Sequence, residues 1–473
     1  MKQPHPAQPA TNSLSSPPVP DGRPVRTVGV PDGAVRVPAP GRAQGPGPEP
    51  PGGPAAADAA APDEEPPHRP PSGRLAGVDL ARYLAVAGML IIHFGVPFLA
   101  PDRPISAIVF TYAWGRSTIL FAFLAGLSLA LVSGGSRPHR GRRARTTAAR
   151  VAVRGASLLA IGWLLHAVIT AGQSNLTVII TFYGLYFLLA LPFLRLPARW
   201  AATAAAVALA AGPQLRFLLC RSNDTDGAMA AFTDAWNAWD PTHVFLGQGV
   251  LDLGVYGYYP ALSYLGAVLA GLAVGRLDLG SPLVRLRLAL GGALLAAVAY
   301  RVSWHAWYNY GLYDALGPRE EVVGSIPTDD AGWLLTSMPH TSTSVELAGG
   351  VGVAMCALVG CLWAAERLPR LLAPFTAAGT MALTVYAMHT LAMAWQAWFP
   401  DHFVGLAGAI DENMSEVFFV ASLIGAFLWR RMVGRGPLEA AVSTLAKAVA
   451  PGPRTGAHAR PRERRSEGAG AGV

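Results

Sequence analysis

Charged residues are scarce in this chain, and cysteine and lysine are scarcer still. Charged residues make up 14% of the sequence, against about 25% in typical soluble domains. The three cysteines form neither a disulfide framework nor a zinc-finger spacing. Lysine occurs only at Lys2 and Lys447, so arginine carries almost all of the positive charge. These shortages exclude an ordinary soluble domain, and we interpret the positive charge as a signal of membrane orientation rather than of nucleic-acid binding.

Long apolar runs fill most of the sequence after residue 72. They begin near residue 78, so we expect no cleavable signal peptide. Residues 1–72 are rich in Pro, Gly and Ala and should form a disordered tail. Residues 73–445 are expected to be an all-α, polytopic membrane domain with about ten transmembrane helices, followed by a disordered basic tail at 446–473. The expected spans are 78–99, 108–132, 151–171, 176–194, 199–219, 256–275, 284–302, 343–364, 371–397 and 413–431.

The gaps between these spans alternate in charge. Every second gap is rich in arginine, beginning with the cluster at 137–154 and ending with the one at 430–435. The other gaps carry the acidic residues, and two of them, 220–255 and 303–342, are long and dense in Trp and Tyr. By the positive-inside rule, both termini are cytoplasmic and the two long aromatic loops lie outside.

The first span carries three ionisable residues, Asp79, Arg82 and His93. Arg82 and His93 are eleven residues apart, which brings them to within about 20° of one helix face and separates them by roughly 16 Å along it. An arginine at the cytoplasmic edge suits a phosphate-bearing ligand, and a neutral imidazole suits general-base work on a hydroxyl or amine. The alternative is that Arg82 is a membrane anchor and His93 a hydrogen-bonded packing residue.

Three further motifs contain candidate site residues. In WGRSTILFAFLAGLSLAL (114–131), Arg116 is expected at the outer face, where it either binds the acceptor or an oxyanion or pairs with an outer-loop acid. In GTMALTVYAMHTLAMAW (379–395), Tyr386 and His389 share a helix face, for chemistry or for interhelical hydrogen bonds. In PHTSTSVELAGG (339–350), His340 lies in an outer loop, and Glu346 either orients a histidine, binds an acceptor or is an interfacial carboxylate.

Three histidines, His93, His166 and His389, are expected at similar depth in the outer half of the membrane and could converge on one cavity. Imidazole is a common zinc ligand. No two of these histidines share a span, however, so the spacing does not support a metal site and none is expected.

The order of these motifs resembles a family. Arg82-x10-His93 resembles the first helix of integral-membrane acyltransferases of the acyltransferase-3 type. Residues 73–93, 115–131 and 182–194 more closely resemble bacterial proteins related to heparan-α-glucosaminide N-acetyltransferase and to YeiB. LTVYAMHTL (383–391) and GRGPLEAA (434–441) are similar to the YeiB-like group. The resemblance covers about residues 74–445 and implies a bacterial plasma-membrane acyltransferase that draws acyl-CoA from the cytosol and acylates a sugar or similar acceptor at the far face.

We therefore expect transfer of an acyl group, with acetyl the first choice, from acyl-CoA to a hydroxyl or amine of an envelope glycan or secreted metabolite. The resemblance implies that His93 is the catalytic base and Arg82 the CoA-side arginine. The remaining candidates are His389 for catalysis, Arg142 and Arg143 for the donor phosphates, and Arg116, Tyr386 and Glu346 for the acceptor. The bilayer is the expected partner, and a homo-oligomer is left open. The alternatives are a multi-pass transporter without acyl-transfer chemistry and a non-catalytic scaffold.

Overall fold

Helices make up all of the regular secondary structure in the part of the chain that the computed structural model describes, which is residues 75–99, 103–172, 176–316, 326–398 and 413–451. The all-α prediction is therefore confirmed. The predicted tails lie outside this part, except that α17 continues past the expected boundary at 445 to Val449. The helices are α1 (Ala76–Phe94), α2 (Pro104–Ala113), α3 (Arg116–Val132), α4 (Gly141–Ala171), α5 (Ile179–Leu189), α6 (Ala198–Thr225), α7 (Gly227–Trp239), α8 (Pro241–Leu246), α9 (Ala261–Val274), α10 (Pro282–Trp304), α11 (Leu312–Leu316), α12 (Ser344–Arg367), α13 (Ala373–Thr380), α14 (Ala382–Trp398), α16 (Met414–Met432) and α17 (Pro437–Val449).

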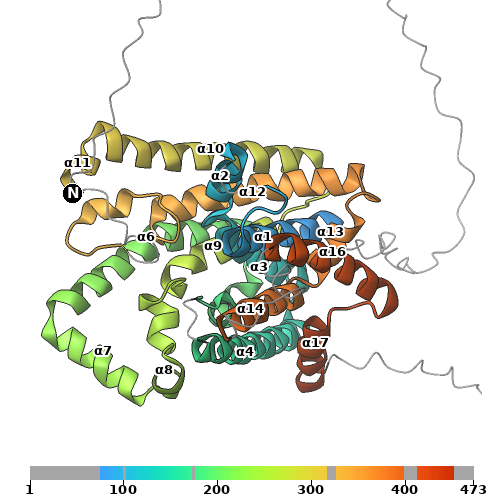
Figure 1. Ribbon diagram of the computed structural model, residues 1–473, viewed down its shortest axis with the longest axis horizontal. Helices are drawn as coiled ribbons and strands as arrows, with labels where there is room; N and C mark the ends of the chain where they lie inside the picture. Colours follow the sequence, from blue (N-terminus) through green and yellow to red (C-terminus); the bar gives the residue numbers. More distant parts are fainter. Residues whose placement is uncertain (1–74, 100–102, 173–175, 317–325, 399–412, 452–473) are drawn as a thin grey trace, which may run out of the picture. The chain divides into compact units, whose positions relative to one another are not determined.

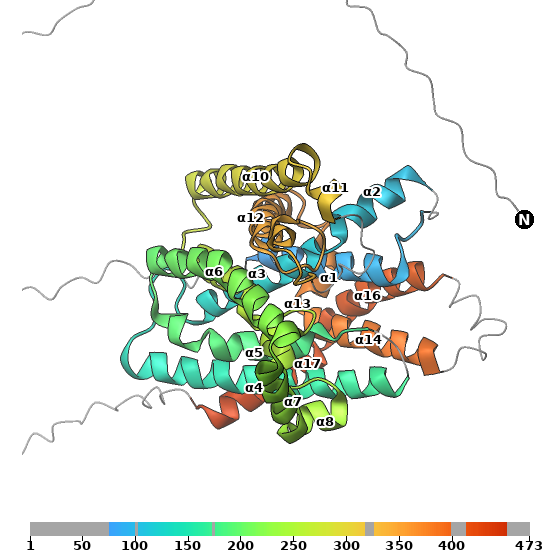
Figure 2. The ribbon, with the colours of Figure 1, turned by 90° about the vertical axis from the view of Figure 1, so that its left-hand side faces the viewer.

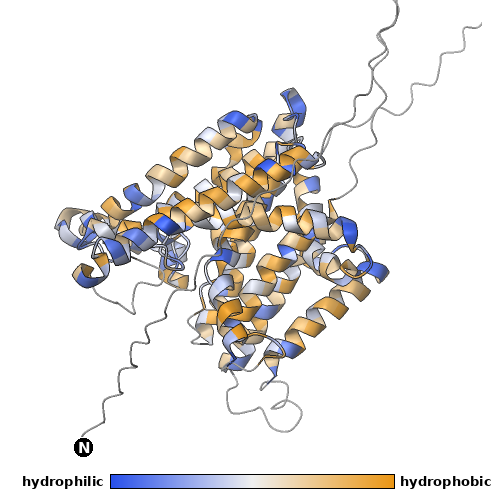
Figure 3. Cartoon of the chain, turned by 90° about the horizontal axis from the view of Figure 1, so that it is seen from above, coloured by the Kyte–Doolittle hydropathy of each residue, from blue (hydrophilic) through white to orange (hydrophobic). Residues whose placement is uncertain are grey.

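Six helices in the described ranges are long and apolar enough to cross a membrane. They correspond to six of the ten expected spans. A seventh is reached if α16 and α17, which are bent by 48° at their junction, count as one span. Along the helices apolar residues predominate, and many of the most polar residues lie near helix ends (Figure 3). The six spans are Ala76–Phe94, Pro104–Val132, Gly141–Ala171, Ala198–Thr225, Pro282–Asn309 and Ser344–Arg367.

The expected count of about ten spans is not confirmed, and the reason is helix length. The spans expected at 176–194 and 256–275 contain α5 and α9, which have 11 and 14 residues, whereas a membrane-crossing helix needs about 20. The span expected at 371–397 is broken at Met381 into α13 and α14. Apolar composition alone did not reveal these breaks.

Helices α1 and α3 run side by side at the centre of the helical bundle, between α12 and α4 (Figures 1 and 2). Glycines permit the closest crossings. A Cβ atom on Gly126 of α3 would lie 1.7 Å from the carbonyl oxygen of Val268 in α9, and one on Gly379 of α13 would lie 1.7 Å from that of Asp79 in α1. Small residues at such crossings let backbones approach, which is how helices pack in a membrane.

Arg276, just after α9, joins the loops on the side of the bundle where α1 begins and α3 ends, which we call the arginine-rich side. Its side chain is buried, at 3% exposure. Because its donors are matched by acceptors from α3 and from the segments after α3 and α5, this arginine acts as a structural clamp. Its acceptors are the carbonyls of Ala130 at 3.0 Å, Gly135 at 2.9 Å, Leu194 at 2.5 Å and Leu196 at 3.2 Å, and the Ser133 hydroxyl at 2.8 Å.

Replacing Arg276 should destabilise the fold. Arg276→Met removes every one of these donors and leaves buried carbonyls without partners. Because a hydrogen bond from a charged donor contributes about 1.5–3 kcal/mol, we expect the free energy of unfolding to fall by more than about 3 kcal/mol. Unfolding in mixed micelles, followed by tryptophan fluorescence, measures the change. Arg287→Ala, at an exposed position of α10, is the matched control, and equal stability of the two variants would contradict the clamp.

Candidate active site

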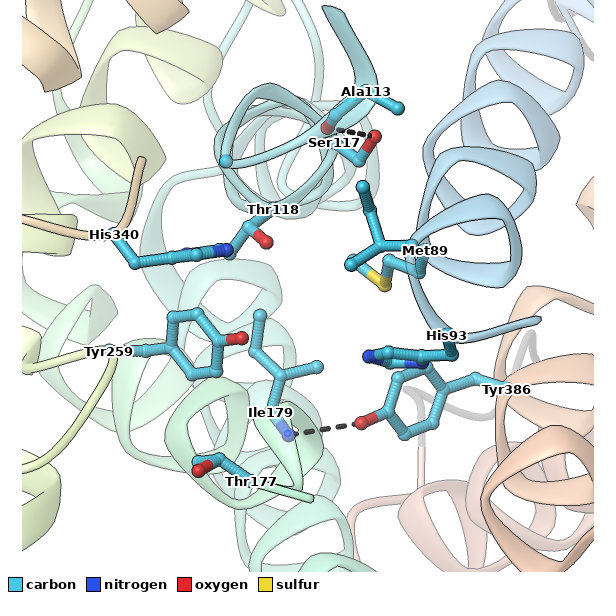
Figure 4. A pocket seen from close by; sticks show the side chains of 12 residues that line it. Met89, His93, Ala113, Ser117, Thr118, Thr177, Ile179, Tyr259, His340 and Tyr386 are labelled. Carbon is cyan, nitrogen blue, oxygen red and sulfur yellow. Dashed lines mark hydrogen bonds between the residues drawn. The ribbon is translucent and has the colours of Figure 1, made fainter. Parts of the chain in front are cut away.

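Two cavities follow one another along the same four helices, α1, α3, α5 and α14. The first, which we call the histidine pocket, lies where α1 ends and α3 begins, and has a volume of about 30 Å³. Figure 4 shows His93 and Tyr386 on one side of it and His340 and Tyr259 on the other. This volume accommodates about one water molecule.

The second cavity lies on the arginine-rich side and is much larger, at about 600 Å³. We call it the cationic cavity because five cationic side chains line it, together with one acid, Glu439. Aromatic and aliphatic side chains, among them Phe121, Tyr183 and Phe187, line the rest. A cavity with a charged mouth and apolar walls suits a ligand with an anionic head and an apolar arm. The cations are Arg82, Arg154, Arg430, Arg435 and Lys447.

A thin wall separates the cavities. On α3, Thr118 lines the histidine pocket, and Phe121, one turn later, lines the cationic cavity. On α5, Ile179 lines the histidine pocket and the next residue, Ile180, lines the cationic cavity. The Tyr183 hydroxyl donates to the carbonyl of Thr118 at 3.2 Å, and the rings of Phe121 and Tyr183 lie 5.1 Å apart. These side chains are the barrier between the two cavities.

Arg82 lines the cationic cavity in a fixed position. Its guanidinium donates to Asp79 Oδ1 at 2.5 Å and to the Ser128 hydroxyl at 2.8 Å. Asp79 is buried, at 2% exposure. The carboxylate and the hydroxyl therefore hold the guanidinium at the cavity wall, as expected for a preorganised anion-binding group.

His93 is paired with His389. Its Nδ1 lies 3.0 Å from Nε2 of His389, and the two rings are nearly parallel, with centroids 5.2 Å apart. His389 Nδ1 lies 2.6 Å from the carbonyl oxygen of Tyr386. His93 lines the histidine pocket, whereas His389 is fully buried behind it. The structure thus brings together two of the three histidines expected at one depth.

The tail motif GRGPLEAA holds α14, the helix that carries Tyr386 and His389. Because α14 starts at a break, its first backbone NH groups have no acceptor within the helix. Glu439 supplies one: its carboxylate accepts from the NH groups of Leu383 and Thr384 at 2.8 and 3.1 Å and from the Thr384 hydroxyl at 2.6 Å. In addition, the Tyr386 hydroxyl oxygen accepts from the Ile179 NH at 3.1 Å. These bonds fix α14 against α5 and α17.

His340 enters the histidine pocket from a strained loop. Its φ is 64°, and that of Ser342 is 58°, a left-handed region that side chains rarely adopt. The buried Glu346 carboxylate stabilises the loop, because it accepts from the His340 and Ser342 NH groups at 2.6 Å each and from the Thr341 hydroxyl at 3.2 Å. Burial, and then the nearby charge of His93, lowers the pKa of His340 to about 4, so this imidazole is neutral at physiological pH.

Sequence reasoning placed His340 in an outer loop without assigning it to the site. The nearest signal was the acid six residues after it, which does orient this loop, through backbone NH groups. Tyr259, Ser117 and Thr118 were also missed as pocket residues. Each comes from a segment distant from His93 in the sequence, and local residue spacing does not predict that such segments meet in one pocket.

Several expected site residues lie elsewhere. Arg116 donates hydrogen bonds to the Tyr300 hydroxyl at 3.1 Å and to the Thr111 carbonyl at 2.8 Å. His166 Nε2 lies 2.9 Å from the Leu246 carbonyl oxygen, and His166 does not line the histidine pocket. Arg142 and Arg143 are exposed at the start of α4 and do not line the cationic cavity. Across the described ranges, no three His, Cys, Asp or Glu side chains are grouped so that they could hold a metal ion.

Comparison with known families divides the chain into two regions. Residues 74–305 match the family described as heparan-alpha-glucosaminide N-acetyltransferase, catalytic. Residues 329–448 match a family described as a protein of unknown function, DUF418. No curated protein matches the chain. The histidine pocket draws on both regions, with His93 and Tyr259 from the first and His340 and Tyr386 from the second. The chain is thus a helical membrane protein in which one region matches the heparan-α-glucosaminide N-acetyltransferase catalytic family and a second matches the DUF418, YeiB-like family, as the order of its motifs predicts.

Proposed function

We propose that the protein is a membrane-embedded acyltransferase that moves an acyl group, with acetyl the first choice, from acyl-CoA to a hydroxyl or amine. The observation that supports this most is the succession of the two cavities along α1, α3, α5 and α14, with cations at one end and histidines at the other. One extended ligand could then have its charged head at Arg82 and its reactive end at His93. The acetyltransferase family match points to the same type of reaction.

The cationic cavity fits the donor. CoA carries a diphosphate and a further phosphate, and guanidinium groups bind phosphate oxygens through paired hydrogen bonds. The five cations supply such donors, and the donor site that we propose retains Arg82. Arg142 and Arg143 lie outside the cavity, so we replace them in the proposed donor site by Arg154, Arg430 and Arg435. Phe121 and Phe187 would line the path of the pantetheine arm.

The chemistry needs one base and one group that stabilises negative charge. His93 takes the proton of the acceptor hydroxyl or amine as the acceptor attacks the thioester carbonyl carbon. The tetrahedral intermediate then collapses, the carbon–sulfur bond breaks, and the CoA thiolate leaves and takes the proton from His93, which regenerates the neutral base. The neutral His340 ring and the Tyr386 hydroxyl face the same pocket and can donate hydrogen bonds to the oxyanion.

The present size of the histidine pocket adds a requirement. A volume of about 30 Å³ holds neither a thioester nor an acceptor. The wall of Phe121 and Tyr183 must therefore move before the donor reaches His93. The acceptor would enter from the end of the bundle where α1 ends and α3 begins, opposite the arginine-rich side. A hydroxyl or amine on an envelope glycan or secreted metabolite fits that direction of entry.

The orientation in the membrane is part of the proposal and gives a separate prediction. With the arginine-rich side in the cytosol, Asp234 and Asp329 lie outside and Arg143 inside, and all three are exposed. In a variant whose native cysteines are replaced by serine, Asp234→Cys and Asp329→Cys should react with an impermeant maleimide on intact cells, and Arg143→Cys only after lysis. Labelling at residue 143 on intact cells would reverse the orientation and put the cationic cavity on the wrong side for cytosolic CoA.

The proposed function is tested with purified protein in proteoliposomes. Acetyl-CoA is added with an envelope glycan fraction, and free CoA thiol is measured over time. We expect CoA to bind without an acceptor and thiol release to require the acceptor. Absence of CoA binding would contradict the acyltransferase hypothesis and favour the transporter hypothesis, because a transporter needs no CoA site.

A further inference from the structure

The two ring nitrogens of His93 are not equivalent, and only one of them can act as a base. A neutral imidazole carries its proton on one nitrogen and a lone pair on the other, and a hydrogen bond decides which is which. Free imidazole side chains favour the proton on Nε2. If His93 followed that preference, its lone pair would lie on Nδ1, which faces His389.

The hydrogen-bond chain behind His93 reverses this preference. A carbonyl oxygen only accepts, so the 2.6 Å contact with Tyr386 requires the proton of His389 on Nδ1. Neutral His389 then has its lone pair on Nε2. That lone pair, 3.0 Å from His93 Nδ1, can only accept, so the proton of His93 is on Nδ1. The lone pair of His93 is left on Nε2.

We propose that His389 is a positioning residue that holds His93 in the Nδ1–H tautomer and so makes Nε2 the base of the histidine pocket. The inference rests on the proposed function. It also gives the DUF418 region a task in this chain: Tyr386 and His389 both lie in it, whereas His93 lies in the acetyltransferase-family region. The region of unknown function completes a site whose base comes from the other region.

The surroundings of His389 suit this task. The side chain has no exposed surface, so water does not compete for its nitrogens. The ring meets Tyr386 edge-on at 4.7 Å between centroids, with Phe94 and Phe418 at 6.2 and 6.4 Å, which restricts its rotation. The carbonyl of Tyr386 also accepts from the Thr390 hydroxyl at 3.0 Å. The hydrogen-bond chain from His93 through His389 therefore ends at a backbone carbonyl, a group that does not change its protonation.

The arrangement parallels the carboxylate–histidine pair of serine hydrolases, with one difference. There, a carboxylate fixes the tautomer and also stabilises the imidazolium, and a substitution that gives the wrong tautomer costs about 10⁴ in rate. His389 is neutral, so it can fix the tautomer but contributes less to stabilising a charged His93. We therefore expect removal of the His389 imidazole to lower the rate of acyl transfer about 10²–10⁴-fold, because His93 would then adopt the wrong tautomer.

Substitutions at His389 separate positioning from packing. His389→Gln keeps an acceptor near the position of Nε2 and should retain transfer within about tenfold of the wild type. His389→Asn keeps a group near Nδ1 but none near Nε2, and His389→Leu keeps only bulk, so both should lose about 10²–10⁴ in rate. A purely structural role predicts no rescue by Gln over Asn and Leu.

The tautomer is measured directly by ¹⁵N spectra of histidine-labelled protein, with the His93 signals assigned by their loss in His93→Gln. We expect Nδ1–H in the wild type and in His389→Gln, and a shift towards Nε2–H in His389→Leu. Nε2–H in the wild type, or an unchanged tautomer in a folded His389→Leu protein, would overturn the proposal. Because these spectra need no substrate, they remain decisive even if no acyl transfer is found, an outcome that would count against the proposed function alone.

Discussion

His93→Ala should abolish acyl transfer while leaving the affinity for CoA largely unchanged. The imidazole lies in the histidine pocket, and the cations that would hold the donor line the other cavity. Removing the base therefore acts on the chemical step and spares donor binding. General-base catalysis contributes about 10²–10⁴ in rate. We expect the loss at or beyond the upper end of that range, because among the described residues that line the pocket only His340 also carries an imidazole, and it lies on the opposite side from His93 (Figure 4).

His93→Gln sharpens this prediction. It keeps a polar side chain of similar size but provides no base, so it should be as inactive as His93→Ala. The wild-type rate should rise with pH to a plateau as His93 loses its proton, since only the neutral imidazole can accept the acceptor's proton. Retention of near-wild-type transfer in His93→Ala would remove His93 from the mechanism and make His340, across the same pocket, the candidate base.

Arg82→Ala should weaken CoA binding by more than tenfold. Charge-assisted hydrogen bonds contribute about 1.5–3 kcal/mol, and each 1.4 kcal/mol corresponds to about a factor of ten in Kd. Arg82→Lys should recover only part of the affinity, because an ammonium lacks the paired donors of a guanidinium. Equilibrium binding of CoA to the purified protein measures both effects. Arg142→Ala, at an exposed position outside the cationic cavity, is the matched control and should bind normally.

Asp79 complicates the interpretation of Arg82→Ala. Its buried carboxylate contacts the Arg82 guanidinium at 2.5 Å, so losing that contact can also affect the stability of the fold. The double variant Asp79→Asn with Arg82→Ala removes that cost and should still bind CoA weakly. Arg435→Ala tests the same cavity at an exposed position and should weaken binding without affecting the fold. Unchanged CoA affinity in both folded variants would remove the cationic cavity as the donor site.

The placement of the two side chains along α1 could be predicted from the sequence, because helical periodicity is local. Arg82 and His93 were expected at different depths of one helix, and they line successive cavities. The common depth of His93 and His389 was also predicted, from the alternating loop charges. Their hydrogen bond was not, because depth does not fix which helices are neighbours.

Other features could not be inferred because they depend on contacts between distant segments. The break at Met381 occurs within an apolar run, and its stabilising partner, Glu439, follows 58 residues later. His340 reaches the pocket only because a buried carboxylate holds its loop in a left-handed conformation. Arg430 and Arg435 were seen only as signals of orientation, since a charge count cannot say which arginines share a cavity.

Transfer of labelled acetyl groups across the membrane tests the central claim most directly. Sealed vesicles that contain the wild type or His93→Ala are given isotopically labelled acetyl-CoA on the arginine-rich side and glycan acceptor on the other. The account predicts labelled acceptor with the wild type and none with His93→Ala, although both bind CoA. Equal labelling with the two proteins, or bound CoA with no labelled acceptor in any glycan or small-molecule fraction, would contradict it.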